Sequence, residues 1–267
     1  MADTERYQLQ GNAPHLYEQG TVPTISRPIA ERTFEHVSLY EGERVLDAAC
    51  GTGIVTRVAV QRFGNIRKIV GVDLNSGMLD VARANTPTTG VSIEWPQGDV
   101  CALPFPDGSF DVVLCQQGLQ FVPDKSAALR DMQRVLARGG RLVFTVAIES
   151  PYHAALADSL TRHVNAEAAT NCLSPFTLRD AGTVWKLVDG AEFRTIDMKV
   201  LEVMIRIRPS SADAMFETMA ARSPFSREIA EVRMTIRQEV SAALQAYRDG
   251  DDFVMPWKTH LVQARVA

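Results

Sequence analysis

The chain has 267 residues and a formal net charge of −4 at pH 7, which suits one large α/β domain with insertions, and it lacks the Lys/Arg block that nucleic-acid substrates usually require. Its four cysteines are scattered without CxxC spacing, which favours reduced thiols in a cytoplasmic protein. The first thirty residues lack the apolar core of a signal peptide, and no stretch approaches the roughly 18 apolar residues of a membrane span.

The N-terminal segment predicts a polar arm followed by a helix. Residues 1–25 are polar with scattered aromatic side chains, among them Tyr17. Ser26 suits an N-cap and Pro28 suits the first helical turn, so we expect a helix from about Arg27 to Ser38.

The stretch Arg-Val-Leu-Asp-Ala-Ala-Cys-Gly-Thr-Gly-Ile, residues 44–54, predicts a strand, a sharp turn and a helix. Residues 45–46 belong to a buried strand, Gly51 and Gly53 turn the chain, and Val55 to Phe63 has helical spacing. Glycine lets the backbone approach a ligand where a Cβ would collide. Such a unit holds nucleotide-like cofactors at the carboxyl edge of a parallel sheet. We therefore predict a cofactor loop, with an ordinary tight turn as the alternative.

Two residues of this loop decide between cofactors. A dinucleotide fingerprint needs a third glycine near position 56, where this chain has Thr56. Asp47 lies where the strand enters the loop, and a carboxylate there opposes a pyrophosphate at a helix N-terminus. S-adenosylmethionine (SAM) carries a sulfonium and an ammonium, which suit a carboxylate. The loop favours SAM, and a NAD-linked oxidoreductase stays a third-ranked alternative.

Beyond the loop, strands and helices alternate, as in a parallel sheet with crossover helices. We expect strands at 68–73, 91–95, 110–115 and 141–148, and helices at 78–84, with Ser76 as a candidate cap, and at 126–137. Further along we expect a helix at 152–169, a crossover helix at 178–189, one long strand or a bent pair at 193–208, helices at 210–221 and 227–247, and a last strand at 259–266.

Several spaced motifs between residues 44 and 146 resemble the class I SAM-dependent methyltransferases. Val-Leu-Asp-Ala-Ala-Cys-Gly-Thr-Gly is similar to their first motif, which usually has Gly at the position of Ala49. Asp-Leu-Asn-Ser-Gly-Met (73–78) resembles the second motif, and Asp99 with Val100 the third. Leu-Pro-Phe (103–105) and Phe-Asp-Val-Val (110–113) look closest to the small-molecule branch typified by ubiquinone/menaquinone biosynthesis methyltransferases. Residues 136–142 resemble the LxPGGxL turn, with Arg138 where proline is usual.

The resemblance implies a doubly wound, mostly parallel seven-stranded sheet of Rossmann-like type, with its last strand inserted antiparallel. Asp73 lies 20 residues beyond Gly53 and would accept the ribose hydroxyls. Leu74 and Met78 would sandwich the adenine. Plain packing would also explain Met78, and likewise Tyr17 in the arm. The expected cofactor-binding residues are Tyr17, Asp47, Ala49, Gly51, Gly53, Asp73, Leu74, Met78, Asp99, Val100 and Gln116.

We expect one methyltransferase domain over residues 1–267. It would comprise an N-terminal cap (1–40), a SAM-binding core (41–148) and helical lid insertions (150–176 and 209–250) beside the cofactor edge.

The segment after the fourth strand, Gln116-Gln117-Gly118, is where the family places residues nearest the transferring methyl. The chain lacks the Asn/Asp-Pro-Pro-aromatic signature of amino-methylating nucleic-acid enzymes, and Cys115 follows Leu114 rather than a proline. Glutamines are poor magnesium ligands, and the histidines show no ligand spacing. We therefore expect no metal and no nucleic-acid partner.

These features predict in-line transfer of a methyl group from SAM to a small, largely apolar molecule, leaving S-adenosylhomocysteine (SAH). A SAM-binding module or a SAM-dependent non-methylating enzyme is the alternative. The acceptor's identity, the methylated atom, the use of a base and the oligomeric state stay open.

We expect the acceptor between the glycine loop and the insertions, beneath the arm. His153 is the candidate proton acceptor, with a surface histidine after a proline turn as the alternative. The expected lining is Gln116, Gln117, Leu119, Phe121, residues 148–153, Phe176, Phe216, Met219, Phe225 and Trp257.

Overall fold

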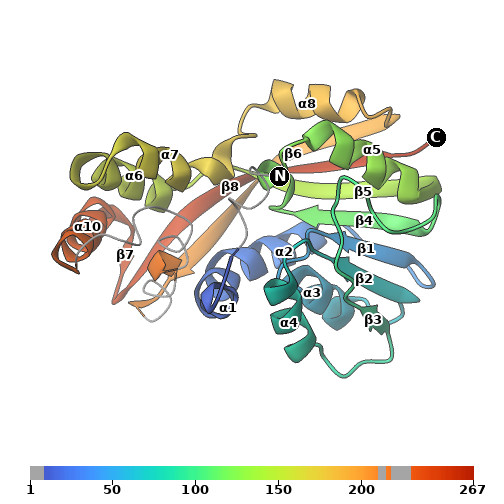
Figure 1. The fold of residues 1–267 in the computed structure, drawn as a ribbon, viewed down its shortest axis with the longest axis horizontal. Helices are drawn as coiled ribbons and strands as arrows, with labels where there is room; N and C mark the ends of the chain where they lie inside the picture. The colour runs from blue at the N-terminus through green and yellow to red at the C-terminus, as the bar shows by residue number, and fades with distance from the viewer. Residues whose placement is uncertain (1–8, 210–214, 218–229) are drawn as a thin grey trace.

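Buried apolar runs form the strands of a central sheet, as expected where helices cover both faces. The computed structural model describes residues 9–209, 215–217 and 230–267. Its sheet has eight strands in the order β3-β2-β1-β4-β5-β8-β6, and β7 pairs with β8 off this path (Figure 1). The strands are β1 Arg44–Ala48, β2 Lys68–Val72, β3 Ser92–Glu94, β4 Phe110–Gln116, β5 Leu136–Glu149, β6 Thr195–Ile207, β7 Arg248–Asp249 and β8 Asp252–Arg265.

The first half of the sheet is parallel. β1 pairs with β2 through Val45 and Ile69, and with β4 through Val45 and Val112. The carboxyl ends of these strands therefore meet at one edge, where ligands bind in doubly wound sheets. The structure confirms the mostly parallel, doubly wound architecture.

The last strand is antiparallel to both of its neighbours, as expected. β8 lies between β5 and β6, with Leu261 opposite Thr145 and His260 opposite Val200. It begins at residue 252, however, earlier than the expected 259. The sequence does not predict residues 252–258 as strand, because proline, here Pro256, is unfavourable in the interior of a strand. The segment expected at 193–208 is one strand, and with β8 it forms a ribbon that reaches beyond the other strands (Figure 1).

Helices pack on both faces of the sheet (Figure 1). On one face, α2 and α3 contribute Phe34 and Val58 to a cluster that includes Val45 of β1. On the other, α5 contributes Leu129 to a cluster that includes Leu46, the next residue of β1. The α-helices are α1 Ala13–Thr21, α2 Arg27–Phe34, α3 Ile54–Arg62, α4 Ser76–Ala84, α5 Lys125–Val135, α6 Pro151–His163, α7 Ala166–Cys172, α8 Ala181–Asp189 and α10 Ala230–Ala243.

A separate apolar cluster forms where α6, α7 and α10 pack on the extended ends of β6 and β8 (Figure 1). Leu156 of α6 and Ile236 of α10 meet Ile205 and Met255 of the ribbon in this cluster. The arm contributes Ile25 and Ile29 to the same cluster. α6, α7 and α10 therefore bury their apolar faces on the ribbon, whereas α8 contributes Val184 and Val188 to the cluster that contains Leu129 of α5.

The N-terminal arm is more regular than expected. Residues 13–34 form one helical run, in which a π-helical turn at Val22–Ser26 joins α1 to α2. Ser26 makes no capping hydrogen bond and the helix ends at Phe34, so the predicted cap and the predicted end at Ser38 are wrong. Because the π-helical turn continues the helix from α1 through Ser26, no helix begins at that residue and its side chain has no capping role.

Two other helix predictions need correction, and two more fall partly outside the described residues. Asn75, and not Ser76, caps α4, because its side chain accepts from the Met78 N–H. The helix expected at 152–169 is two helices, and Asn165 caps the second by accepting from the Ala168 N–H at 2.8 Å. Of the expected helix at 210–221 only 215–217 are described, and the start of the one at 227–247 also falls outside the described residues.

Gly71 in β2 allows a close contact with Trp95. A Cβ at Gly71 would lie 2.3 Å from Cζ3 of Trp95, whose indole N–H donates to Thr86 at 2.8 Å. We expect Gly71→Ala to lower the free energy of unfolding by about 1–3 kcal/mol, since overpacking displaces a fixed ring. Urea denaturation measures this, and Gly71→Ala combined with Trp95→Leu should recover part of the loss.

Gly64→Ala is the matched control, because a Cβ at Gly64 meets nothing within 4 Å. Equal losses in the Gly64 and Gly71 variants would contradict the contact.

Candidate active site

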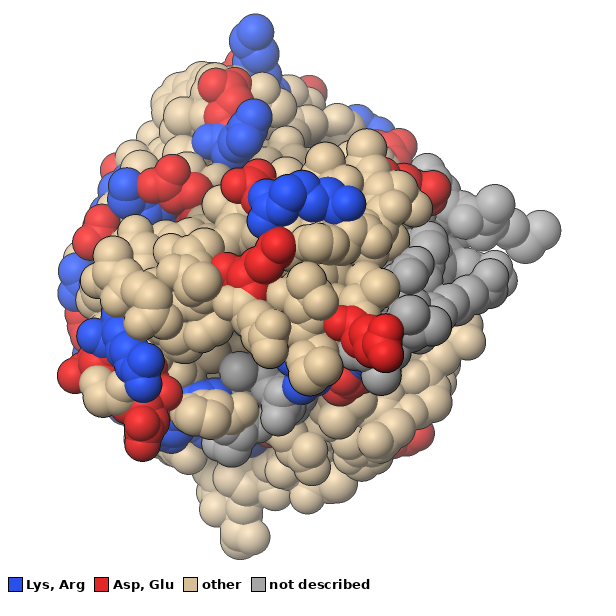
Figure 2. All heavy atoms as spheres, turned by 90° about the vertical axis from the view of Figure 1, so that its left-hand side faces the viewer, with Lys and Arg blue, Asp and Glu red and all other residues tan. Residues whose placement is uncertain are grey.

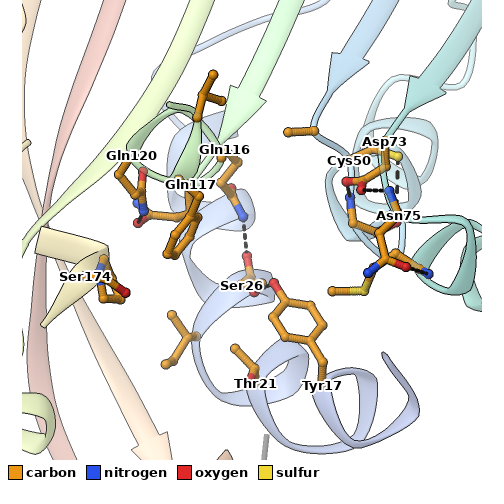
Figure 3. A pocket seen from close by; sticks show the side chains of 18 of the residues that line it. Tyr17, Thr21, Ser26, Cys50, Asp73, Asn75, Gln116, Gln117, Gln120 and Ser174 are labelled. Carbon is orange, nitrogen blue, oxygen red and sulfur yellow. Dashed lines mark hydrogen bonds between the residues drawn. The ribbon is translucent and has the colours of Figure 1, made fainter. Parts of the chain in front are cut away.

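One cavity opens at the carboxyl edge of β1, β2 and β4. In Figure 3 Asp73 and Asn75 lie on one side of it, Gln116 and Gln117 on the other, and Tyr17 of α1 below. The lining comprises Tyr17, Thr21, Ile25, Ser26, Asp47, Ala49, Cys50, Gly51, Ile54, Val55, Asp73, Leu74, Asn75, Met78, Gly98, Asp99, Val100, Gln116, Gln117, Gly118, Gln120, Phe121, Val122, Pro123, His153, Leu156, Leu160, Ala168, Asn171, Cys172, Ser174, Pro175, Met215, Phe216 and Trp257.

The glycine loop has left-handed backbone at its key positions. Gly51 has a φ of 55° and a Cβ there would meet nothing within 4 Å, so its backbone faces open space. Gly53 has a φ of 79° but does not line the cavity. A Cβ at Gly53 would lie 2.4 Å from Trp95. Packing against Trp95 therefore requires glycine at position 53, and direct access to the cavity does not explain it.

Ala49 takes the position at which the resembling family usually has glycine. Its φ is 54°, in the region that favours glycine. A Cβ at Gly118 would lie 2.7 Å from the Cβ of Ala49. Gly118 therefore leaves room for the alanine, a relation that the sequence motif does not reveal.

Asp47 is a buried carboxylate with one unpaired oxygen. Its Oδ2 accepts from the backbone N–H and the hydroxyl of Thr56 at 3.2 and 2.8 Å. Its Oδ1 has no hydrogen-bond partner among the described residues. Burial raises the pKa of Asp47 to about 7, against the lowering effect of the Thr56 hydrogen bonds. An orphaned, buried acceptor of this kind fits the cationic groups that SAM carries.

Two other carboxylates line the same end of the cavity. Asp73 accepts from the backbone N–H groups of Gly51 at 2.8 Å and of Asn75 at 2.9 Å. Asp99 accepts from the backbone N–H of Cys101 at 2.8 Å. The carboxylates are thus oriented by backbone donors beside the lining residues Leu74, Met78 and Val100.

The arm is tied to both sides of the cavity. The hydroxyl of Tyr17 bonds to that of Ser26 at 3.0 Å, and the Gln116 amide donates to the Ser26 carbonyl at 2.8 Å (Figure 3). Arg57 of α3 pairs with Glu18 at 2.6 Å, and both side chains are largely buried. No local sequence pattern predicts this pair, because Glu18 and Arg57 lie 39 residues apart in the chain.

His153 lies at the apolar end of the cavity and is 6% exposed, so the surface alternative is wrong. Its ring packs against those of Phe176 and Trp257, with centroids 5.2 and 5.5 Å away. Its Nδ1 lies 3.2 Å from the Ser150 hydroxyl. Burial lowers the pKa of His153 to about 4, so the ring is neutral at pH 7.

The structure brings together most, but not all, of the expected acceptor residues. Leu119 is buried away from the cavity and Ile148 does not line it. Phe176 does not line it either, but its ring contacts those of the lining residues His153 and Trp257. Met219 and Phe225 lie outside the described residues.

The part of the chain that the structure describes has no metal-ligand cluster, no membrane-spanning helix and no reactive thiol at Cys115. No three His, Cys, Asp or Glu side chains there gather as metal ligands do. No described helix combines the length and the apolar character that crossing a membrane would need. Cys115 is buried in the core, and burial raises its thiol pKa to about 12.

Comparison with known proteins identifies the class. A sequence profile described as a methyltransferase domain matches residues 46–144. Over 192 residues the chain is 32% identical to the ubiquinone/menaquinone biosynthesis C-methyltransferase of Cronobacter sakazakii, covering 70% of this chain and 71% of that relative. The chain therefore belongs to the class I SAM-dependent methyltransferases. SAM is their cofactor, and the NAD-linked alternative is set aside.

Two further similarities are more limited, the first in its extent and the second in its sequence identity. The chain is 46% identical over 102 residues to the enzyme of the same name from Xanthomonas oryzae pv. oryzae, a match that covers 38% of this chain. It spans only 40% of that relative. The solved structure of Haemonchus contortus phosphoethanolamine N-methyltransferase 2, with phosphomonomethylethanolamine and SAH, has a TM-score of 0.59 at 17% identity. That match covers 95% of this chain and 57% of the other, and it shows a shared fold.

The Asp47 carboxylate should make cofactor binding pH-dependent. Because its pKa is about 7, the affinity for SAH should fall about tenfold between pH 8 and pH 6, as a proton must leave before a cation binds. Titration calorimetry measures this. Asp47→Asn should bind more weakly at pH 8 and lose the pH dependence, and identical profiles for the two proteins would contradict the assignment.

His153 should limit stability in acid. Its folded pKa of about 4 lies below the ordinary 6.5, so its contribution is complete above pH 6.5 and is lost as the pH falls through 4. We expect this loss to reach about 3 kcal/mol. Urea denaturation between pH 7 and pH 4 should show that His153→Leu lacks this decline, whereas the exposed His15→Leu keeps it. The same decline in both variants would refute the effect.

Proposed function

We propose that the protein transfers the methyl group of SAM to a small, largely apolar acceptor bound in the same cavity. The carrying observation is that one continuous lining joins the Asp47, Asp73 and Asp99 carboxylates to an apolar wall that includes Leu156 and Trp257. Cofactor and acceptor would therefore meet in one chamber. SAM supplies a methyl group already activated by its sulfonium.

In this proposal the chain's own residues bind and orient both reactants. Asp47 holds the ammonium with its unpaired oxygen, Asp73 accepts the ribose hydroxyls, and Asp99 with the Val100 backbone holds the adenine. The expected residues Tyr17, Ala49, Gly51, Leu74, Met78 and Gln116 line the cavity and are proposed to shape the cofactor pocket. Gly53 does not line it and is proposed to act only through the packing of the loop against Trp95. Alignment of this kind can supply up to about 7–11 kcal/mol of rate enhancement.

The helical run of the arm has a second role, the exclusion of water. Tyr17, Thr21 and Ile25 line the cavity from this run, and the buried Glu18–Arg57 pair anchors it to α3. A dry site strengthens electrostatic interactions and prevents hydrolysis of the cofactor.

His153 is proposed as the proton acceptor for a hydroxyl substrate. Its position in the cavity wall and its neutral state at pH 7 support this role. A pKa of about 4 makes the imidazole a weak base. The role therefore fits acidic hydroxyls best, and other acceptors would need no base.

The wider assignments are proposals as well. The cap (1–40), core (41–148) and lid insertions (150–176 and 209–250) form one domain, which acts without a metal in the cytoplasm. The four thiols, none of them paired in a disulfide, support that location. Positive and negative side chains are interspersed on the described part of the face in Figure 2, which favours a small molecule over nucleic acid as the substrate.

The cofactor part is tested at Asp73. Asp73→Ala should weaken SAH binding by about 1.5–3 kcal/mol, the range for hydrogen bonds to a charged group, and Asp73→Asn should recover only part of it. Asp80→Ala on the exposed side of α4 is the control. Wild-type affinity in Asp73→Ala would show that the cofactor lies differently.

Methyl transfer is tested separately from binding. Incubation with radiolabelled SAM and a metabolite extract should move the label into small molecules extractable by organic solvent. Tight SAH binding without labelled product would instead favour a SAM-binding module or a non-methylating enzyme.

A further inference from the structure

Two side chains in the cavity wall each bury a polar atom without a partner. Gln120 is 4% exposed and Trp257 is 3% exposed, and both line the cavity. Gln120 Oε1 and Trp257 Nε1 have no hydrogen-bond partner among the described residues. A buried polar atom left unpaired is destabilising, so each such atom in a native protein indicates a missing partner.

A chain of hydrogen bonds determines which end of the Gln120 amide is unpaired. The Thr259 hydroxyl donates to the Val146 carbonyl at 2.8 Å, so its oxygen accepts from the Gln117 amide nitrogen at 2.9 Å. The Gln117 amide oxygen then accepts from the Gln120 amide nitrogen at 3.0 Å. In this chain the nitrogen of each amide donates to the next oxygen, so the Gln120 nitrogen faces Gln117. The unpaired atom of Gln120 is therefore its amide oxygen, which can only accept.

The indole N–H of Trp257 can only donate. The unpaired atoms of these two side chains are therefore one acceptor, Gln120 Oε1, and one donor, Trp257 Nε1. Trp257 and Thr259 are two residues apart on one face of β8, which separates them by roughly 7 Å. Gln120 lies beside Gln117 (Figure 3) and is linked through it to Thr259 by hydrogen bonds. Ring contacts with His153 and Phe176 fix the indole on this wall.

Charge is absent from this end of the cavity within the described residues. No Lys, Arg or Glu is in the described lining, and its carboxylates are Asp47, Asp73 and Asp99 at the cofactor end. His153 is neutral at pH 7. A charged acceptor would therefore lose its hydration there without meeting a counter-charge, which is unfavourable.

We propose that Gln120 and Trp257 select an uncharged acceptor molecule that offers a hydroxyl or N–H group to Gln120 and an oxygen or nitrogen lone pair to Trp257. This inference rests on the proposed function and adds the polarity of the substrate to it. Gln117 and Thr259 are positioning residues, because their hydrogen bonds orient the Gln120 amide. Gln117 lines the cavity and Thr259 does not.

Matched naphthalene probes test the pair by calorimetry with saturating SAH. Wild type should bind 2-naphthol at least tenfold more tightly than 2-methoxynaphthalene, which lacks the donor, and 2-acetylnaphthalene more tightly than 2-ethylnaphthalene, which lacks the lone pair. The charged 2-naphthoate and 2-naphthylmethylammonium should bind at least tenfold more weakly than 2-naphthol.

The variants assign each preference to one residue. Gln120→Met should remove the preference for 2-naphthol, and Trp257→Phe the preference for 2-acetylnaphthalene, both with SAH affinity unchanged. Thr259→Val should reduce the 2-naphthol preference although Thr259 does not line the cavity, because the Gln120 amide is then no longer oriented. Gln61→Met, on the exposed side of α3, is the control.

Three outcomes would overturn the proposal: preferences that survive in Gln120→Met and Trp257→Phe, charged probes that bind as tightly as neutral ones, or no binding of any probe beside SAH. Failure of the wild-type protein to bind SAH at all is a different result. It would remove the proposed function itself.

Discussion

The hydrogen bond from the Gly51 backbone N–H to the Asp73 carboxylate, at 2.8 Å, joins the loop after β1 to the end of β2. The same carboxylate accepts from Asn75, whose side chain caps α4 and donates to the Leu9 carbonyl in the arm. The parallel strands bring these groups to one edge of the sheet. Hydrogen bonds around one carboxylate thus hold four parts of the chain together: the loop after β1, the end of β2, α4 and the arm. The shape of the cavity depends on this arrangement.

Polarity is divided along this cavity. The cofactor end has Asp47 with a pKa raised to about 7 and a free acceptor oxygen, so that it is prepared for a cation. The other end lies between the turn Leu119–Phe121, which contains Gln120, and the β6–β8 ribbon with its helices, which contain Trp257 and His153. All three side chains are neutral at pH 7. Low polarity there raises the penalty for burying a charge. This division suits the proposed pairing of a sulfonium cofactor with an apolar acceptor in one chamber.

Contiguous residues were enough to predict the cofactor half. The strand, glycine turn and helix of residues 44–63 are encoded by local periodicity and by glycines at positive φ, and the structure has them within a residue or two. The antiparallel last strand came from the family resemblance alone. The π-helical turn at Val22–Ser26 escaped prediction because it interrupts the repeat that periodicity detects.

The sequence by itself determined the class of fold, the cofactor and three carboxylates that the structure has in the lining of the cavity. Tertiary structure decided the rest: that Gly53 is glycine because Trp95 packs over it, that His153 is buried beside Trp257, and how the Gln120 amide is oriented through Thr259. A local pattern indicates which face of an element a side chain occupies. It does not indicate which distant residue lies opposite, and the protonation and direction of buried polar groups depend on that neighbour.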